Sequence, residues 1–182
     1  MKHHFKHICY DIDQLTSGTK KLSQFMTRLR AQANSSPDMH DPDKYFGDGF
    51  EALIEVLIIE MGTSPYIQIK GYSPITELDM GVDGIGYGPN GEAHTVQIKA
   101  RSNTQSVLTA NEDHISNFVA HSFTKYNAQN LTLFTTAKGL HEDVSNNMYM
   151  SKVNTIGYAA LTKLIDNNLM FWDTFRDHLI EH

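Results

Sequence analysis

The sequence predicts an α/β protein in which helices flank a mixed central sheet. Segments 64–72, 81–88 and 94–100 are β-rich and are joined by turn-forming residues, which is typical of an antiparallel meander. A long apolar helix pattern precedes these strands, and strand-like and helix-like segments alternate after them. A chain of 182 residues with 40% hydrophobic residues is long enough for one globular domain and too short for two of full size.

The first expected helix spans residues 14–33 and is amphipathic. One face carries four apolar residues at helical spacing: Leu22, Phe25, Met26 and Leu29. We expect this face to pack onto the core, with contact to DNA or to a dimer partner as the alternative for this basic helix. Residues 34–43 contain two prolines and are typical of a loop. Residues 1–40 are therefore expected to form an N-terminal helical extension of a main domain at 41–182.

Residues 45–62 give the strongest helix pattern of the chain. Their apolar side chains repeat every three or four positions, and Gly62 is well placed to end the helix. Glu51 and Glu55 lie one turn apart, beside the apolar face rather than opposite it. Glu51 is the preferred candidate for a functional carboxylate on this helix, and Glu55 is the alternative.

Three strands and then alternating elements follow this helix. Residues 64–72 alternate polar side chains with isoleucines, and the turn at 89–92 joins the glycine-rich segment 81–88 to the β-branched segment 94–100. Thr109-Ala-Asn-Glu112 fits a capping box that opens a helix reaching about Tyr126. The rest of the chain predicts a buried strand at 131–136, a short helix at 138–150, a strand at 153–158 and one or two amphipathic helices at 160–180.

The formal net charge of −6 argues against a protein held to nucleic acid by bulk positive charge. The charges are unevenly placed along the chain. Residues 1–35 have six basic and two acidic side chains, residues 36–60 have one and seven, and the remaining residues have eight and twelve. The acidic side chains are thus partly concentrated in one short segment, and this concentration requires a local explanation.

Three further features indicate the compartment. No run approaches the roughly 18 consecutive apolar residues of a membrane helix. The N-terminal segment lacks the apolar core of a signal peptide, and a single cysteine, Cys9, excludes an internal disulfide. The neighbouring His3, His4 and His7 do not make a recognisable zinc-binding spacing with it. We therefore expect a soluble, cytoplasmic protein with no membrane partner.

Several side chains suited to one chemistry are expected to meet. Gln97 and Lys99 point to the same face of their strand, an antiparallel neighbour can bring Asp83 beside them, and a packed helix can add Glu51. Carboxylate and amide oxygens suit Mg²⁺, which can polarise a phosphodiester and lower the pKa of an attacking water. A lysine beside it can orient that water or stabilise the developing charge. The pattern therefore predicts a phosphodiesterase site.

This pattern resembles the PD-(D/E)XK nuclease superfamily, which places an acid on a helix, an Asp on a strand and (D/E/Q)-x-K on the next strand. The closest likeness is to the Mrr-like restriction endonuclease branch, and it covers about residues 45–168. Val82 stands where proline is usual, and neutral Gln97 replaces an acid, which removes one negative charge from the metal site. The matching segments are Gly49-Phe50-Glu51, Gly81-Val82-Asp83-Gly84-Ile85 and Val96-Gln97-Ile98-Lys99.

The resemblance implies a restriction-endonuclease-like core and a Mg²⁺-dependent DNA endonuclease, with Mn²⁺ as a substitute metal. Nucleases of this fold often pair subunits to cut both strands, so a homodimer is expected. Asp79 is a rival to Asp83, but it lies before the strand. The residues implied to hold the metal are Glu51, Asp83, Gln97 and the carbonyl of Ile98, and Lys99 is implied to assist the attacking water.

Other residues are candidates for contact with the substrate. Thr135 and Thr136 end a buried strand and are expected to face the substrate. The candidates for contact with DNA phosphates are Lys70, Arg101, Lys125 and Lys138.

The favoured function is DNA cleavage in a bacterium or a phage-infected cell, in DNA processing, recombination or defence, with loops, DNA structure or a partner protein supplying specificity. One alternative is a non-catalytic nucleic-acid-binding or regulatory protein on the same fold, in which Gln97 marks a decayed site. The other is an RNA-directed nuclease. Net charge does not exclude the favoured function, because a bound Mg²⁺ would offset two negative charges locally. It predicts weak binding to undamaged duplex that salt removes quickly.

Overall fold

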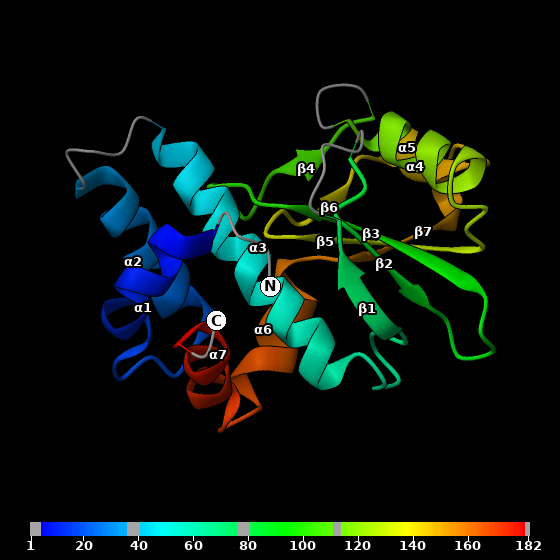
Figure 1. Ribbon diagram of the computed structural model, residues 1–182. Coiled ribbons are helices and arrows are strands. Elements are labelled where there is room, and N and C mark those ends of the chain that lie inside the picture. Colours follow the sequence, from blue (N-terminus) through cyan, green and yellow to red (C-terminus); the bar gives the residue numbers. More distant parts are fainter. Residues whose placement is uncertain (1–4, 36–40, 76–80, 111–113, 181–182) are drawn as a thin grey trace.

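A five-stranded mixed sheet, ordered β1-β2-β3-β5-β7, runs through the described part of the protein (Figure 1). The computed structural model describes residues 5–35, 41–75, 81–110 and 114–180. Neighbouring strands are antiparallel from β1 to β3 and parallel from β3 to β7, so the predicted mixed α/β class is confirmed. The strands of this sheet are β1 (Lys70–Pro74), β2 (Gly84–Tyr87), β3 (Ala93–Lys99), β5 (Asn130–Thr135) and β7 (Val153–Ile156).

Helix α3 (Pro42–Met61) lies between the sheet and the N-terminal helices (Figure 1). One hydrophobic cluster joins α3 to the sheet residues Val96, Phe134 and Ile156 and to four further helices. The N-terminal helices therefore share one core with the sheet. The four helices are α1 (Lys6–Thr16), α2 (Leu22–Ser35), α6 (Tyr158–Asp166) and α7 (Phe171–Ile180).

A second hydrophobic cluster covers the other face of the sheet, where Leu131 and Leu133 pack against α4 (Ile115–Thr124). Short elements complete this side: α5 (Glu142–Ser145), a 3₁₀ turn at Met150–Lys152, and a parallel pair of strands, β4 (Val107–Leu108) and β6 (Gly139–Leu140). Among the described residues, no helix has both the length and the apolar character that crossing a membrane requires.

The single helix predicted at 14–33 is wrong, because the chain forms two helices there. Helix α1 ends at Thr16, α2 begins at Leu22, and Gly18 between them has a φ of 65°, a left-handed conformation that glycine adopts without steric cost. The hydroxyl of Thr16 donates to the carbonyl of Ile12, which places a polar group at the end of α1. The apolar face itself is confirmed: its members are buried, namely Leu22, Phe25, Met26 and Leu29.

Several other predicted elements differ from the structure in their bounds, and one of them also differs in type. Strand β1 begins at Lys70 because residues 64–68 form turns and Gln68 has a φ of 57°. The helix predicted at 138–150 is instead β6 followed by the short α5. The helix predicted from Thr109 begins at Ile115, and Glu112 of the proposed capping box lies outside the described residues. The segment 160–180 forms two helices, α6 and α7.

Helix α3 is fixed at its N-terminus by local hydrogen bonds. The side chain of Asp41 accepts from the backbone N–H groups of Asp43 and Lys44, each at 3.0 Å, and Pro42 occupies the first helical position. A Cβ atom on Gly49 would overlap the side chain of Leu29. Gly49, two residues before Glu51, therefore lets α2 approach α3 closely.

We predict that Leu29→Ala lowers the free energy of unfolding by about 2–5 kcal/mol, because Leu29 is completely buried between α2 and α3. The matched control is Leu169→Ala, whose side chain is 91% exposed and whose loss should cost about 0.5 kcal/mol or less. Urea unfolding followed by circular dichroism measures both variants. Equal stability of the two variants would show that α2 does not pack on the core in solution.

Candidate functional site

A cleft of about 390 Å³ lies between the N-terminal half of α3 and the chain that leaves β3. Glu51 lines it from α3, and Lys99, the last residue of β3, lines it from the sheet. Ile98 and Arg101 line the same cleft. The structure therefore brings four of the residues singled out in the sequence to one place.

Asp83 is held at the point where β2 and β3 separate. Its backbone N–H donates to the carbonyl of Val96 at 2.8 Å. Its Oδ2 accepts a hydrogen bond from the backbone N–H of Ile98 at 2.7 Å. The last register pair of the two strands is Gly84 with Val96, so the carboxylate takes the place of a backbone acceptor beyond it. Asp83 is thereby fixed beside the two β3 residues that line the cleft.

The ammonium group of Lys99 lies partly buried at the edge of the protein interior. Burial lowers the pKa of its ammonium, the charge of Arg101 lowers it further, and the charge of Asp83 partly offsets both effects. Lys99 and Asp83 are thus close enough to act on each other. A half-desolvated ammonium exerts a stronger field on a bound anion than one in free water.

The phenol of Tyr72 on β1 lies within the electrostatic influence of three carboxylates. Burial raises the pKa of its phenol well above its ordinary value, and the charges of Glu55, Asp83 and Glu51 raise it further. Its hydroxyl is buried and has no hydrogen-bond partner within the part of the chain that the structure describes. A Cβ on Gly84 would overlap the Tyr72 ring, so the glycine beside Asp83 makes room for it. Sequence reasoning missed Tyr72, since a tyrosine in a strand carries no distinguishing signal.

Gln97 does not join this group. It is 3% exposed, and its Nε2 lies 2.9 Å from where a Cβ on Gly81 would stand, a position that also borders Phe118 of α4. Gln97 is absent from the described lining of the cleft, whereas Lys99, two residues later, reaches it. Lys99 reaches the cleft from the end of β3, whereas Gln97 lies within the strand and points toward Gly81.

The donor set fits a sparsely coordinated metal only. Within the described ranges, no group of three His, Cys, Asp or Glu side chains could hold an ion. Glu51 and Asp83 are each close enough to Tyr72 for their charges to raise the pKa of its phenol. Mg²⁺ commonly binds proteins through one or two carboxylates and completes its shell with waters and substrate phosphates. Two carboxylates with a nearby backbone carbonyl therefore suit Mg²⁺.

Two buried threonines hold the chain that carries Lys99 and Arg101. The hydroxyl of Thr135 donates to the carbonyl of Lys99 at 2.7 Å. The hydroxyl of Thr136 donates to the carbonyl of Arg101 at 2.7 Å and accepts from its N–H at 2.5 Å. Both threonines have no exposed surface. Their hydroxyl groups fix the backbone of the site. The sequence had predicted instead that these threonines face the substrate.

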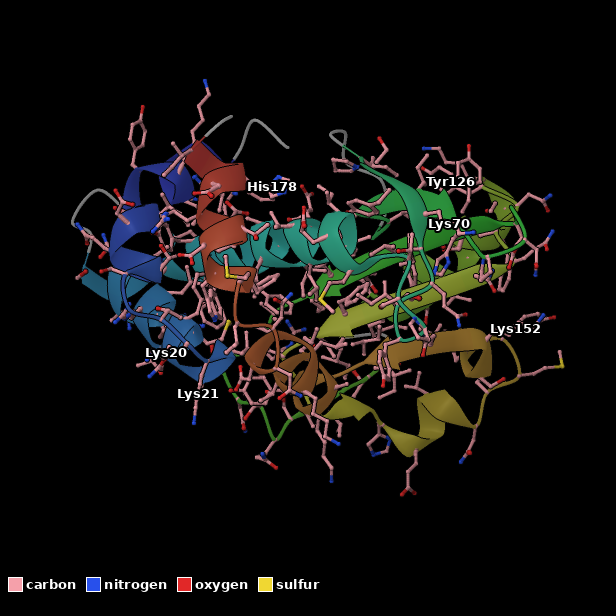
Figure 2. All side chains as sticks on the ribbon, turned by 90° about the horizontal axis from the view of Figure 1, so that it is seen from below. Lys20, Lys21, Lys70, Tyr126, Lys152 and His178 are labelled. Atoms are coloured by element: carbon pink, nitrogen blue, oxygen red, sulfur yellow. The ribbon has the colours of Figure 1, made fainter. Side chains whose placement is uncertain are left out.

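The four predicted phosphate-contacting residues are divided between the two ends of the sheet. Arg101 lines the cleft, and Lys138 follows β5 at the same end as Lys99. Lys70 pairs in register with Tyr87 at the opposite end. Figure 2 shows Lys70 and Tyr126 on the side of the molecule away from α1 and α2, and Lys125 lies over the Tyr126 ring at 5.3 Å. Lys70 and Lys125 are therefore remote from the cleft.

The N-terminal helices supply residues that sequence reasoning did not connect to the site. Arg30 of α2 lines the cleft, donates to Asp43 at 2.7 Å and to the Ser102 hydroxyl, and lies 3.9 Å above the Phe46 ring. His7 of α1 lies 3.2 Å from Asp48, a third acid of the cleft. These contacts cross from residues 5–35 to α3. The sequence offers no periodic signal for them.

The N-terminal histidines form no described metal group. His3 and His4 lie outside the described residues, and His7 contacts Asp48 instead of Cys9. Burial raises the pKa of the Cys9 thiol. Asp79, the rival to Asp83, also lies outside the described residues.

No family model and no curated protein sequence matches this chain. Among solved structures, the chain is similar to the crystal structure of protein VC1899 from Vibrio cholerae, with 9% sequence identity and a TM-score of 0.44. The match covers 93% of this chain and 55% of that one, so this chain spans about half the length of that protein.

We predict that Tyr72→Phe raises the free energy of unfolding by about 1 kcal/mol, because it removes a buried hydroxyl that makes no described hydrogen bond. The control is Tyr45→Phe, which should lower the free energy of unfolding by about 1–2 kcal/mol because the Tyr45 hydroxyl donates to Asp11 at 2.6 Å. Denaturant unfolding gives both values. Destabilisation by both substitutions would mean that the Tyr72 hydroxyl has a partner in solution.

Proposed function

We propose that this protein is a Mg²⁺-dependent endonuclease that hydrolyses phosphodiester bonds in DNA. The observation that carries the proposal is that Glu51 and Lys99 line one cleft, while Asp83 is hydrogen-bonded to Ile98 of the same lining and acts on the charge of Lys99. Two carboxylates suit the metal, and a lysine suits the anionic substrate. The resemblance of these segments to the PD-(D/E)XK motifs supports the same reaction.

The residues of the chain divide the work of such a reaction. Glu51 and Asp83 would hold Mg²⁺, with the Ile98 carbonyl as a further donor, and Mg²⁺ would act as a Lewis acid and as a source of a more acidic water. The Ile98 N–H orients the Asp83 carboxylate from behind. The Lys99 ammonium would orient the attacking water and stabilise the charge that develops on the phosphorus oxygens. Gln97 does not border the described cleft, and its Nε2 lies beside Gly81.

The setting of this activity follows the same proposal. A homodimer would place two clefts on opposite strands, and a protein partner or DNA structure would supply specificity in the cytoplasm of a bacterium or a phage-infected cell.

Two observations favour a second candidate, a non-catalytic nucleic-acid-binding protein on the same fold. They are the orientation of Gln97 and the lack of a three-residue metal group among the described residues.

A cleavage panel separates these candidates. Supercoiled plasmid, linear duplex, branched DNA and RNA are incubated with the protein in Mg²⁺, in Mn²⁺ and in EDTA. We expect cleavage of DNA only with a metal, and a loss of about 100-fold or more for Asp83→Asn and Glu51→Gln. Asp173→Asn is the control, since Asp173 is an exposed carboxylate on α7. Binding without cleavage would favour the second candidate, and cleavage of RNA alone would favour an RNA-directed nuclease.

The pH dependence tests Lys99. Its pKa is lowered by burial and by Arg101, so the protonated form is lost at a lower pH than for an exposed lysine. We expect the DNA cleavage rate to fall at high pH, with a midpoint below the ordinary lysine value of about 10.4. Lys99→Arg, which keeps its charge, should move this fall to higher pH or abolish it. An unchanged high-pH limb in Lys99→Arg would remove Lys99 from the proposed mechanism.

A further inference from the structure

A second cavity, of about 340 Å³, joins the candidate cleft on the side of α2. The two spaces share Arg30, Phe46, Arg101 and Ser102, so they are adjacent and meet at Arg30; together we call them the groove. The groove begins at Glu51 and Lys99 in the cleft and continues past the shared residues into the second cavity. An extended chain lying in it would pass the proposed metal ligands first and the second cavity next.

The junction of the two cavities suits a phosphate. Arg30 and Arg101 contribute guanidinium groups, and Ser102 contributes a hydroxyl. Arg30 is held in place by the Phe46 ring at 3.9 Å, and Thr136 holds the backbone of Arg101. Guanidinium groups bind phosphates through paired hydrogen bonds, and a fixed guanidinium loses little freedom on binding.

A carboxylate of the cleft, Asp43, pairs with Arg30 at 2.7 Å. The described lining of the second cavity includes no carboxylate, whereas Arg30 and Arg101 both border it. In the cleft, Asp48 contacts Lys44 at 2.5 Å and His7 at 3.2 Å. Burial alone would raise the pKa of Asp48, but hydrogen bonds from His7 and Lys44 outweigh it and lower the pKa. Arg30 and Arg101 are the charged side chains in the described lining of the second cavity, so a phosphate would meet cationic groups on that side.

The walls of the second cavity suit a nucleoside. Hydroxyl groups line one part and match the hydrogen-bonding groups of a sugar, while an aromatic ring and a thioether side chain offer contacts for a base. Its volume lies near the lower end of the range for small-molecule sites, about 300–1,000 Å³. Pockets of this kind receive a base only when it has left the stack. The residues in question are Ser23, Thr27 and Thr104 for the hydroxyls, with Met26 and Tyr158.

We propose that the second cavity holds one unpaired nucleotide of a DNA strand, next to the phosphate that is cleaved. Arg30 and Arg101 bind the phosphate at the junction of the two cavities. The position of the cleaved phosphate rests on the function proposed above, whereas the nucleotide site does not. Single-stranded, frayed or branched DNA therefore binds better than intact duplex. Because α2 supplies Arg30 and Thr27, the N-terminal helices form part of the substrate site.

The test is binding without catalysis. Fluorescence anisotropy of a fluorescein-labelled 12-nucleotide DNA strand is measured in EDTA, alone and as a duplex, with the wild-type protein and with Thr27→Trp, which fills the cavity from an exposed position of α2. We expect tighter binding of the single strand than of the duplex. Thr27→Trp should weaken single-strand binding about tenfold, the scale of losing one stacked base.

Thr124→Trp is the matched control. Thr124 is also an exposed helical threonine whose hydroxyl donates to the carbonyl four residues earlier, as the hydroxyl of Thr27 does, but it lies on α4 and outside the described lining of the groove. The Thr124→Trp variant should bind the single strand and the duplex as the wild type does. Arg30→Gln should reduce the slope of log K against log salt for the single strand by about 0.7, the value for one phosphate contact.

Each outcome decides between the proposals. Equal binding of single strand and duplex, or unchanged single-strand binding by a folded Thr27→Trp, overturns the nucleotide site and leaves the nuclease proposal standing. Cavity-dependent binding of the single strand without cleavage in the Mg²⁺ panel overturns the nuclease proposal alone. If Thr27→Trp fails to fold, as circular dichroism would show, Ser23→Trp fills the same cavity and is judged by the same criteria.

Discussion

The candidate site depends on how the C-terminal end of β3 is held after β2 turns away from it. Beyond the pairing of Gly84 with Val96, the backbone of β3 has lost its antiparallel neighbour. The Asp83 carboxylate satisfies the N–H of Ile98, and Thr135 and Thr136 satisfy the chain beyond it from the other side. A buried backbone group without a partner would be costly, so these side chains are required for folding as well as for any chemistry. The same contacts aim Lys99 and Arg101 at the cleft.

The second determinant is the central position of α3. Its buried face packs on the sheet, and its other surface receives α1, α2 and α7, so the helix is enclosed by apolar contacts along most of its length. Glu51 escapes this enclosure only where the cleft opens. Gly49 lets α2 come close, and that approach brings Arg30 over Phe46 and into the groove. The close packing of α2 against Gly49 thus sets the distance between α2, which lies outside the family resemblance, and the proposed metal ligands.

Local patterns predicted much of this arrangement, and they failed where tertiary contacts decide. The apolar periodicity of α3 and the alternation of β3 correctly indicated a buried helix, a central strand and the proximity of Glu51, Asp83 and Lys99. Gly18 breaks the first helix because a single left-handed residue interrupts a pattern that otherwise continues. Alternation gives Gln97 and Lys99 one face, but it does not show that α4 covers only the first of them. Tyr72 and Arg30 reach the site through contacts over long sequence distances, which periodicity does not encode.

The net charge of −6 acts differently from the charges at the groove. At physiological salt, exposed charges are screened beyond about 8 Å, so the overall excess of acid weakens long-range attraction of DNA without reversing the field at a short-range site. Two of the acids concentrated in 36–60 pair with nearby cations: Asp43 with Arg30, and Asp48 with Lys44. These pairs position cations around the cleft, which is a local reason for the acidic segment. Under the proposals above, a ligand would gain affinity by placing its phosphate within contact distance of Arg30 and Arg101.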